Sequence, residues 1–300
     1  MRALAWFLGL FAAALVAIAL FTYPAWLLLH PHFDFPFHRI GERIGMLALL
    51  AGFMLVARRL GVADRASLGY GSARREFVRE MLIGLGLGVV TMLAVVGIMT
   101  ALGLLDWTQA AGLGALGLAK LVLLRLLSGL AVAFIEETFL RGAMLSAIER
   151  ESGTRAAILL TALLYSATHF FARFHIPPEQ VTAWSGLDLL AGTLQSFAHP
   201  LSIADAFLCL LAVGVVLGGV RAATGNIGAC IGLHAGWVWV MLVTHAMSQP
   251  IQTAPLRFLL SRFDGFVGWL VLAWTVVIGA GLWRFYKKRC KRRRRFQPTD

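Results

Sequence analysis

The stretch Phe134–Arg141 places charged side chains inside a long apolar segment. Glu136, Glu137 and Arg141 fall within six positions of each other there. An ionisable residue at membrane depth costs roughly 2.5–3.5 kcal/mol on insertion scales, so such a cluster indicates pairing or function. In a helix, Glu137 and Arg141 share one face and are expected to form an ion pair. Because successive residues point about 100° apart, we expect Glu136 and Glu137 to serve different sites, which leaves Glu136 for chemistry.

Two further apolar segments each carry a histidine. His169 lies four residues after Tyr165, and His234 lies four residues before Val238. Glu136 and His169 each lie 14 residues from the same expected cytoplasmic turn, and His234 lies 13 residues from another. At 1.5 Å per residue, these offsets place all three at a depth of about 21 Å. We therefore expect the three side chains to meet in one layer, although a lone membrane histidine is often only a hydrogen-bond partner between helices.

The composition sets the fold class in which these residues act. Of 300 residues, 59% are hydrophobic and 14% are charged, whereas soluble domains average about 25% charged residues. Repeated apolar runs predict an all-α, polytopic transmembrane bundle of about eight spans, and they are too long and unalternating for a membrane β-barrel. The expected spans are 3–29, 44–57, 81–105, 116–148, 156–172, 203–220, 227–246 and 265–283.

The chain divides into three expected parts. Residues 1–80 hold N-terminal transmembrane helices and a basic cytoplasmic connector, 81–247 hold a core with the polar motifs, and 248–300 hold the last span and a basic tail. The loop 173–200 has no predicted role. The three cysteines, at 209, 230 and 290, have no spacing typical of a disulfide framework or a thiolate metal site.

The net charge of +12 is concentrated near one end, with nine of the 27 Lys and Arg between Arg284 and Arg295. Such a tail is typical of a cytoplasmic membrane flank that binds anionic lipid, so we expect no nucleic-acid partner. Under the expected topology, the inner segments carry 19 Lys and Arg and the outer loops carry five. This asymmetry predicts that both termini are cytoplasmic. The Ala-, Gly- and Arg-rich composition suggests a bacterial source and hence the inner membrane.

The three polar stretches resemble the CPBP family of intramembrane proteases, which includes the CAAX prenyl endopeptidases. The family pattern is Glu-Glu-x3-Arg, then an aromatic residue-x3-His, then His-x3-Asn. The resemblance covers about residues 81–247. In this chain the motifs read Glu136-Glu137-x3-Arg141, Tyr165-x3-His169 and His234-x3-Val238.

The resemblance implies a CAAX-like intramembrane protease that cleaves a membrane-associated protein or peptide without a cofactor. In that scheme Glu136 and His169 activate a water, and His234 faces the oxyanion. The ion pair of Glu137 with Arg141 fixes the helix that carries Glu136.

Val238 departs from the family pattern, because valine cannot donate the hydrogen bond that the usual asparagine offers. If that asparagine helps to hold the oxyanion, another donor must replace it. The donors nearest in sequence are Trp237, Trp239, Tyr165 and Thr168.

Three other functions fit parts of the same pattern. Glu136, His169 and His234 would also suffice as zinc ligands, although zinc sites usually contain a closely spaced ligand pair, which is absent here. Ionisable residues at mid-membrane also build proton-coupled transporters. Finally, the Val238 departure is compatible with a catalytically impaired membrane chaperone or immunity factor of the same fold.

Overall fold

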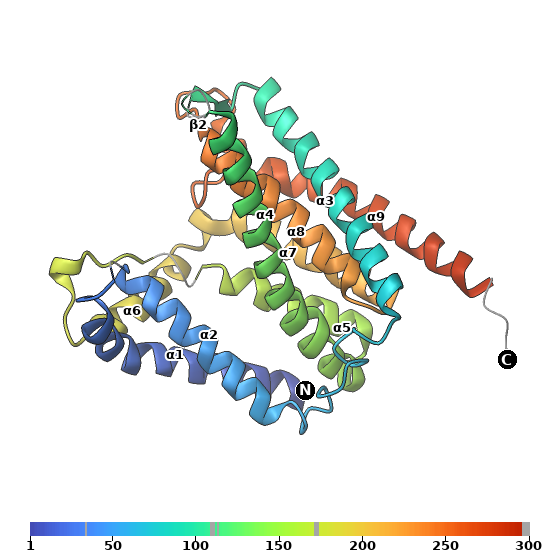
Figure 1. Ribbon diagram of the computed structural model, residues 1–300, viewed down its shortest axis with the longest axis horizontal. Coiled ribbons are helices and arrows are strands. Elements are labelled where there is room, and N and C mark those ends of the chain that lie inside the picture. Colours follow the sequence, from blue (N-terminus) through green and yellow to red (C-terminus); the bar gives the residue numbers. More distant parts are fainter. Residues whose placement is uncertain (34, 109–111, 113, 171–173, 296–300) are drawn as a thin grey trace.

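The protein is an all-α bundle, as the composition predicted (Figure 1). The computed structural model describes residues 1–300 except 34, 109–111, 113, 171–173 and 296–300. The long helices are α1 (Arg2–Leu29), α2 (Phe37–Val56), α3 (Arg74–Ala101), α4 (Ala115–Glu137), α5 (Leu145–Thr168), α7 (Pro200–Thr224), α8 (Gly228–Met247) and α9 (Trp269–Arg295). The shorter elements are the π-helix η2 (Thr138–Met144), α6 (Ser185–Ala198), the 3-10 turns η3 (Pro178–Gln180) and η4 (Arg257–Leu259), and the strands β1 (Leu105–Asp106) and β2 (Gln249–Pro250).

Six helical stretches among the described residues are long and apolar enough to cross a membrane. They overlap seven of the eight expected spans, because the stretch Ala115–Thr168 holds α4, η2 and α5. The expected span at 44–57 lies in α2, which is not among the six. Its first turns carry Arg39, Glu42 and Arg43, which leave too short an uninterrupted apolar run.

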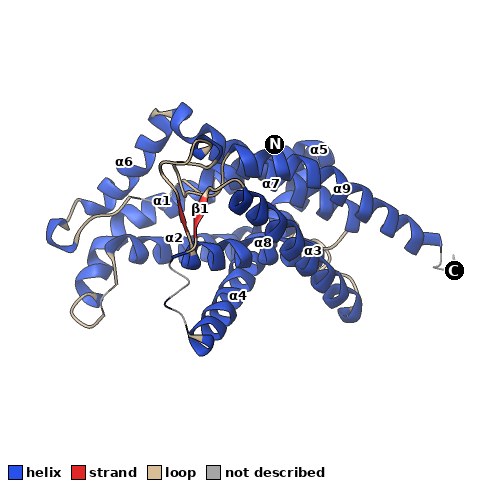
Figure 2. Ribbon diagram, turned by 90° about the horizontal axis from the view of Figure 1, so that it is seen from above, coloured by secondary structure: helices blue, strands red, loops and turns tan. Residues whose placement is uncertain are grey.

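The helices form two groups. In Figure 1, α3, α4, α8 and α9 gather on one side, while α1, α2 and α6 lie together on the other. Figure 2 shows the same division from above, with α6 and α9 at opposite ends. Within the first group α3 and α4 pack on α8, and α7 joins α9 to α5. The strands β1 and β2 pair antiparallel, with Leu105 opposite Pro250, and so tie the end of α3 to the end of α8.

Glycines set the close approach of α3 and α8. A Cβ atom added at Gly232 would lie 2.0 Å from the carbonyl oxygen of Met81, and one at Gly84 would lie 2.4 Å from that of Ala229. Small residues four apart allow backbones to approach in this way. The seam consists of Gly84 and Gly88 on α3 and Gly232 and Gly236 on α8. His234 lies between the two glycines of α8 and is therefore held deep in the bundle.

The helix that carries the two glutamates changes its winding directly after them. We expected one helix over 116–148, but the α-helix ends at Glu137 and the seven-residue π-helix η2 follows it. The expected turn near Gly153 is present, since this residue has φ +79° and interrupts α5. Phe139 of η2 packs edge-on against Phe7 and Phe53, at ring-centroid distances of 5.5 and 5.7 Å. The helices α1 and α2 therefore support the π-helix.

The segment 173–200, expected as a loop, contains the fourteen-residue helix α6. Its weakly apolar middle provides one face that packs against α1. The described part of this segment is thus a short helix attached to the α1–α2 group.

Candidate active site

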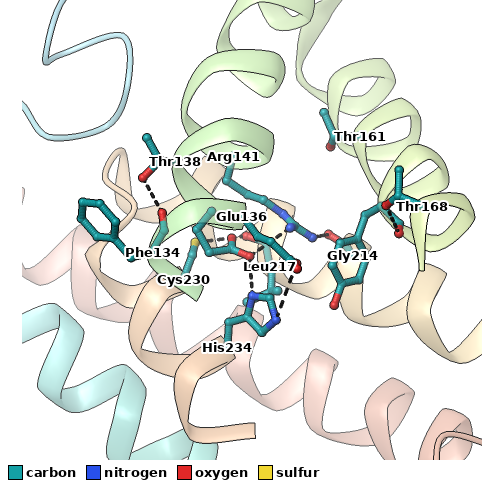
Figure 3. Close-up of polar contacts among 12 residues, drawn as sticks. Phe134, Glu136, Thr138, Arg141, Thr161, Thr168, Gly214, Leu217, Cys230 and His234 are labelled. Atoms are coloured by element: carbon teal, nitrogen blue, oxygen red, sulfur yellow. Dashed lines mark hydrogen bonds and ion pairs between the residues drawn. The ribbon is translucent and has the colours of Figure 1, made fainter. Parts of the chain in front are cut away.

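Three charged or polar side chains form a buried chain inside the bundle. The Arg141 guanidinium donates to Oε1 of Glu137 at 2.9 Å, and both side chains are fully buried. Nδ1 of His234 lies 2.8 Å from the same oxygen. Arg141 also reaches the carbonyl of Gly214 at 3.5 Å (Figure 3). The expected pairing of Glu137 with Arg141 is therefore present, and it extends to His234.

Glu136 and Glu137 both lie beside His234, but only Glu136 lines the cavity, while Glu137 is buried behind it. Oε2 of Glu136 lies 4.0 Å from Nε2 of His234, while Oε1 of Glu137 lies beside Nδ1. The two glutamates do leave the helix in different directions, but an imidazole ring offers a nitrogen on each of two sides. The imidazole ring therefore lies between the two carboxylates, and Figure 3 shows Glu136 beside His234.

The Glu136 carboxylate is the more accessible of the two. Its side chain is 32% exposed, whereas that of Glu137 is fully buried. The separation of 4.0 Å from His234 is too long for a direct hydrogen bond. Oε2 of Glu136 is buried and forms no hydrogen bond with any described residue. No described residue therefore uses the hydrogen-bonding capacity of this oxygen.

His169 is oriented by the backbone of its own helix. Its Nδ1 lies 2.8 Å from the carbonyl oxygen of Tyr165. A carbonyl only accepts hydrogen bonds, so Nδ1 carries the hydrogen and Nε2 is the acceptor in the neutral ring. The ring also packs edge-on against Tyr165, with centroids 4.4 Å apart. His169 thus presents a basic nitrogen on the side away from its backbone contact.

All three predicted catalytic residues line one cavity of about 220 Å³. Tyr165, Trp237 and Val238 contribute to the same wall, while Glu137 and Arg141 lie behind it. Val238 thus borders the cavity one helical turn beyond His234, as its spacing predicted. Glu136 of α4, His169 at the C-terminal cap of α5 and His234 of α8 therefore line the same cavity.

The hydrogen bonds show which side chain could donate to the oxyanion in place of the asparagine that the family pattern has at position 238. Among the described residues, the Tyr165 hydroxyl donates to no other group, and it belongs to the cavity wall. The other named donors already have acceptors: Trp237 donates to Thr91 Oγ1 at 2.9 Å, Trp239 to the Val122 carbonyl at 2.9 Å and Thr168 to the Tyr165 carbonyl at 2.9 Å.

Sequence reasoning missed several polar residues of the cavity, namely Thr91, Cys209, Asp264 and Thr275. They come from α3, α7, the segment before α9, and α9 itself. None belongs to a motif, and only Asp264, followed by Gly265, has a turn signal that marks it in the sequence.

A metal was the minority alternative for the same three residues. Across the described residues, no group of three or more His, Cys, Asp or Glu side chains is arranged so that it could hold a metal ion. Cys209 and Cys230 are buried and form no disulfide with any described residue.

The fold and the site define an integral membrane protein with a polar cavity enclosed by apolar helices. Residues 118–240 match the family model described as Type II CAAX prenyl endopeptidase Rce1-like, which confirms the predicted resemblance. The matched segment begins in α4 and ends in α8, so it contains all three motifs. At the family level the match supports a CAAX-type intramembrane protease. Comparison with curated proteins and with solved structures gave no match.

Proposed function

We propose that this protein is an intramembrane endopeptidase that hydrolyses peptide bonds in a membrane-associated protein or peptide. The observation that carries the proposal is the convergence of Glu136, His169 and His234 on one cavity within the segment that matches the family model. The free Oε2 atom of Glu136 adds support, because a general base needs an oxygen that no other group occupies.

In the proposed reaction, Glu136 removes a proton from a water that also donates a hydrogen bond to Nε2 of His169. The resulting hydroxide attacks the carbonyl carbon of the scissile bond and forms a tetrahedral intermediate. When the intermediate collapses, the C–N bond breaks and the proton held by Glu136 passes to the leaving nitrogen. The products are a carboxylic acid and an amine, so the balance requires only water.

His234 and Tyr165 are the proposed donors to the oxyanion. Glu137 accepts the hydrogen at Nδ1 of His234, which directs Nε2 toward Glu136. A protonated Nε2 donates to the oxyanion, and the hydroxyl of Tyr165, which donates to no described residue, supplies a second donor in the cavity that Val238 also lines. Donors that are already oriented stabilise the developing charge without further reorganisation.

The remaining proposals concern the surroundings of the site. We propose that catalysis needs no metal or other cofactor and that the protein lies in a bacterial inner membrane with both termini in the cytoplasm. The basic tail would bind anionic lipid, although Arg289 at its start already pairs with Glu80 at 3.2 Å. That pair holds the beginning of the tail against α3.

A cleavage assay on the purified protein in liposomes tests the proposal. Glu136→Gln should abolish hydrolysis of membrane peptides, whereas Glu179→Gln, on the exposed turn η3, should leave it unchanged. Hydrolysis should also survive treatment with a metal chelator. Hydrolysis that persists in Glu136→Gln overturns the proposal. Loss on chelation that zinc alone restores would identify a metal enzyme instead.

A further inference from the structure

The cavity contains a second fixed carboxylate, which belongs to none of the motifs. Asp264 lies in the segment before α9, and its side chain lines the cavity together with Glu136. Its Oδ1 accepts hydrogen bonds from the backbone N–H groups of Phe266 at 2.9 Å and Val267 at 2.8 Å. These two bonds hold the carboxylate in place against the cavity wall.

The distance between the Asp264 carboxylate and His234 is estimated from the residues of α8 that lie near Asp264. Met241 lines the same cavity seven residues beyond His234. His245, eleven residues beyond it, contacts the ring of Phe266 at 5.5 Å. At 1.5 Å per residue, Met241 and His245 lie about 10–16 Å beyond His234. We place Asp264, which shares the cavity with Met241 and precedes Phe266 by two residues, at the same level of the bundle. An extended peptide covers this distance in about three to five residues.

Among the described residues, no lysine or arginine of the cavity lining balances the Asp264 charge. Asp264 also forms no ion pair with any described residue. Apart from the polar side chains named above, the cavity walls are largely apolar and include Leu210, Val213, Trp237, Met241, Val271 and Trp274. Asp264 is partly buried, and its Oδ1 is held by two backbone N–H groups, but no described cation stands beside it. A cation in the occupant would therefore gain a favourable contact with this carboxylate.

We propose that Asp264 is a specificity-determining residue that binds a cationic group of the substrate, an amine or a guanidinium. The cation lies three to five residues from the scissile bond, and the intervening residues are apolar. The proposal rests on the proposed endopeptidase function and deepens it by giving the substrate a chemical class. A charge-assisted hydrogen bond to the fixed carboxylate would set the register of the peptide at Glu136.

Single-span peptides in liposomes test this assignment. The peptides are identical except for one lysine, acetyl-lysine or glutamate, placed in turn at each position within six residues of the cleavage site. The native protein should cleave the peptide with lysine at one position, three to five residues away, about tenfold to hundredfold faster in kcat/KM than its acetyl-lysine counterpart. Asp264→Asn should remove this preference, because it keeps the Oδ1 acceptor and loses only the charge.

A matched control separates the role of the charge from that of the turn. Asp106 also accepts a backbone N–H bond, from Thr108 at 3.0 Å, but it does not line the cavity. Asp106→Asn should therefore retain the lysine preference. In Asp264→Lys, the glutamate peptide should become the preferred one, which a purely structural role would not produce.

The possible outcomes distinguish this inference from the function on which it rests. A lysine preference that survives in Asp264→Asn overturns the assignment, and so does an equal loss of cleavage for all peptides. If the native protein shows no cleavage that depends on Glu136, the proposed function itself fails.

Discussion

At the scale of single residues, Glu137 does more than pair with Arg141. Its Oε1 also contacts Nδ1 of His234, so one buried carboxylate holds both a cation and a proposed catalytic ring. Removing one member of a buried charge pair costs about 3–5 kcal/mol, because the other charge remains without compensation. Glu137 should therefore affect both stability and activity.

The first prediction follows from this double contact. Glu137→Gln should lower the free energy of unfolding by about 3–5 kcal/mol, measured by denaturant titration in detergent, and should slow cleavage. Glu42→Gln is the control, because it breaks a pair with Arg39 that is largely exposed and should change little. Full stability in Glu137→Gln would show that Arg141 has another counter-charge.

The second prediction concerns the oxyanion. Removing one donor typically lowers kcat by about 100- to 1,000-fold, so we expect a loss of this size in Tyr165→Phe. Trp237→Phe should cost much less, because the indole N–H already binds Thr91. Val238→Asn should be neutral if Tyr165 suffices and faster if it does not. An unchanged rate in both Tyr165→Phe and Val238→Asn would place the oxyanion elsewhere.

The sequence predicted which three ionisable residues meet, because offsets from loop charges give depth along a helix. It could not predict how far a side chain reaches. The two glutamates lie beside different ring nitrogens of the same histidine, and helix geometry alone does not predict this arrangement. Asp264 was missed for a related reason, since a loop residue has no periodic position from which to infer its depth.

At the scale of elements, the seam between α3 and α8 positions His234. The segments that cross the bundle were predicted well, because long apolar runs identify them. The change to a π-helix after Glu137 was not, because winding responds to contacts with other elements, here with Phe7 and Phe53. The charged start of α2 and the amphipathic α6 were likewise difficult to assign from hydropathy alone.

The third prediction tests the seam. In Gly232→Ala the new methyl group would lie 2.0 Å from the Met81 carbonyl, so α3 and α8 must separate and His234 must move. We expect a loss of stability of about 1–3 kcal/mol and a fall in cleavage. Gly86→Ala on α3 is the control, because its methyl group would meet no atom within 4 Å. Equal thermal unfolding temperatures for the two variants would contradict the close packing.

At the scale of the whole molecule, charge and hydropathy together predict an orientation. With α2 counted as a span, as the eight-span topology requires, the connector between α2 and α3 and the basic end of α9 are expected on the cytoplasmic side, whereas the β1–β2 pair is expected on the outer side. The aspartate that we propose binds the substrate cation is then also expected toward the outer side. The orientation therefore decides which side of the membrane the Asp264 end of the cavity faces.

The last prediction is the topology, tested by cysteine labelling in intact cells. Ala63 and Thr253 are both exposed and lie on opposite expected sides. Cys290 is partly exposed and is first replaced by serine, while Cys209 and Cys230 are buried and can remain. A membrane-impermeant maleimide should label Thr253→Cys in intact cells and Ala63→Cys only after the cells are opened. The excess of 19 over five basic residues on the expected inner side is the physical reason. Labelling of Ala63→Cys in intact cells would invert the orientation and place the outer end of the cavity, with Asp264, toward the cytoplasm.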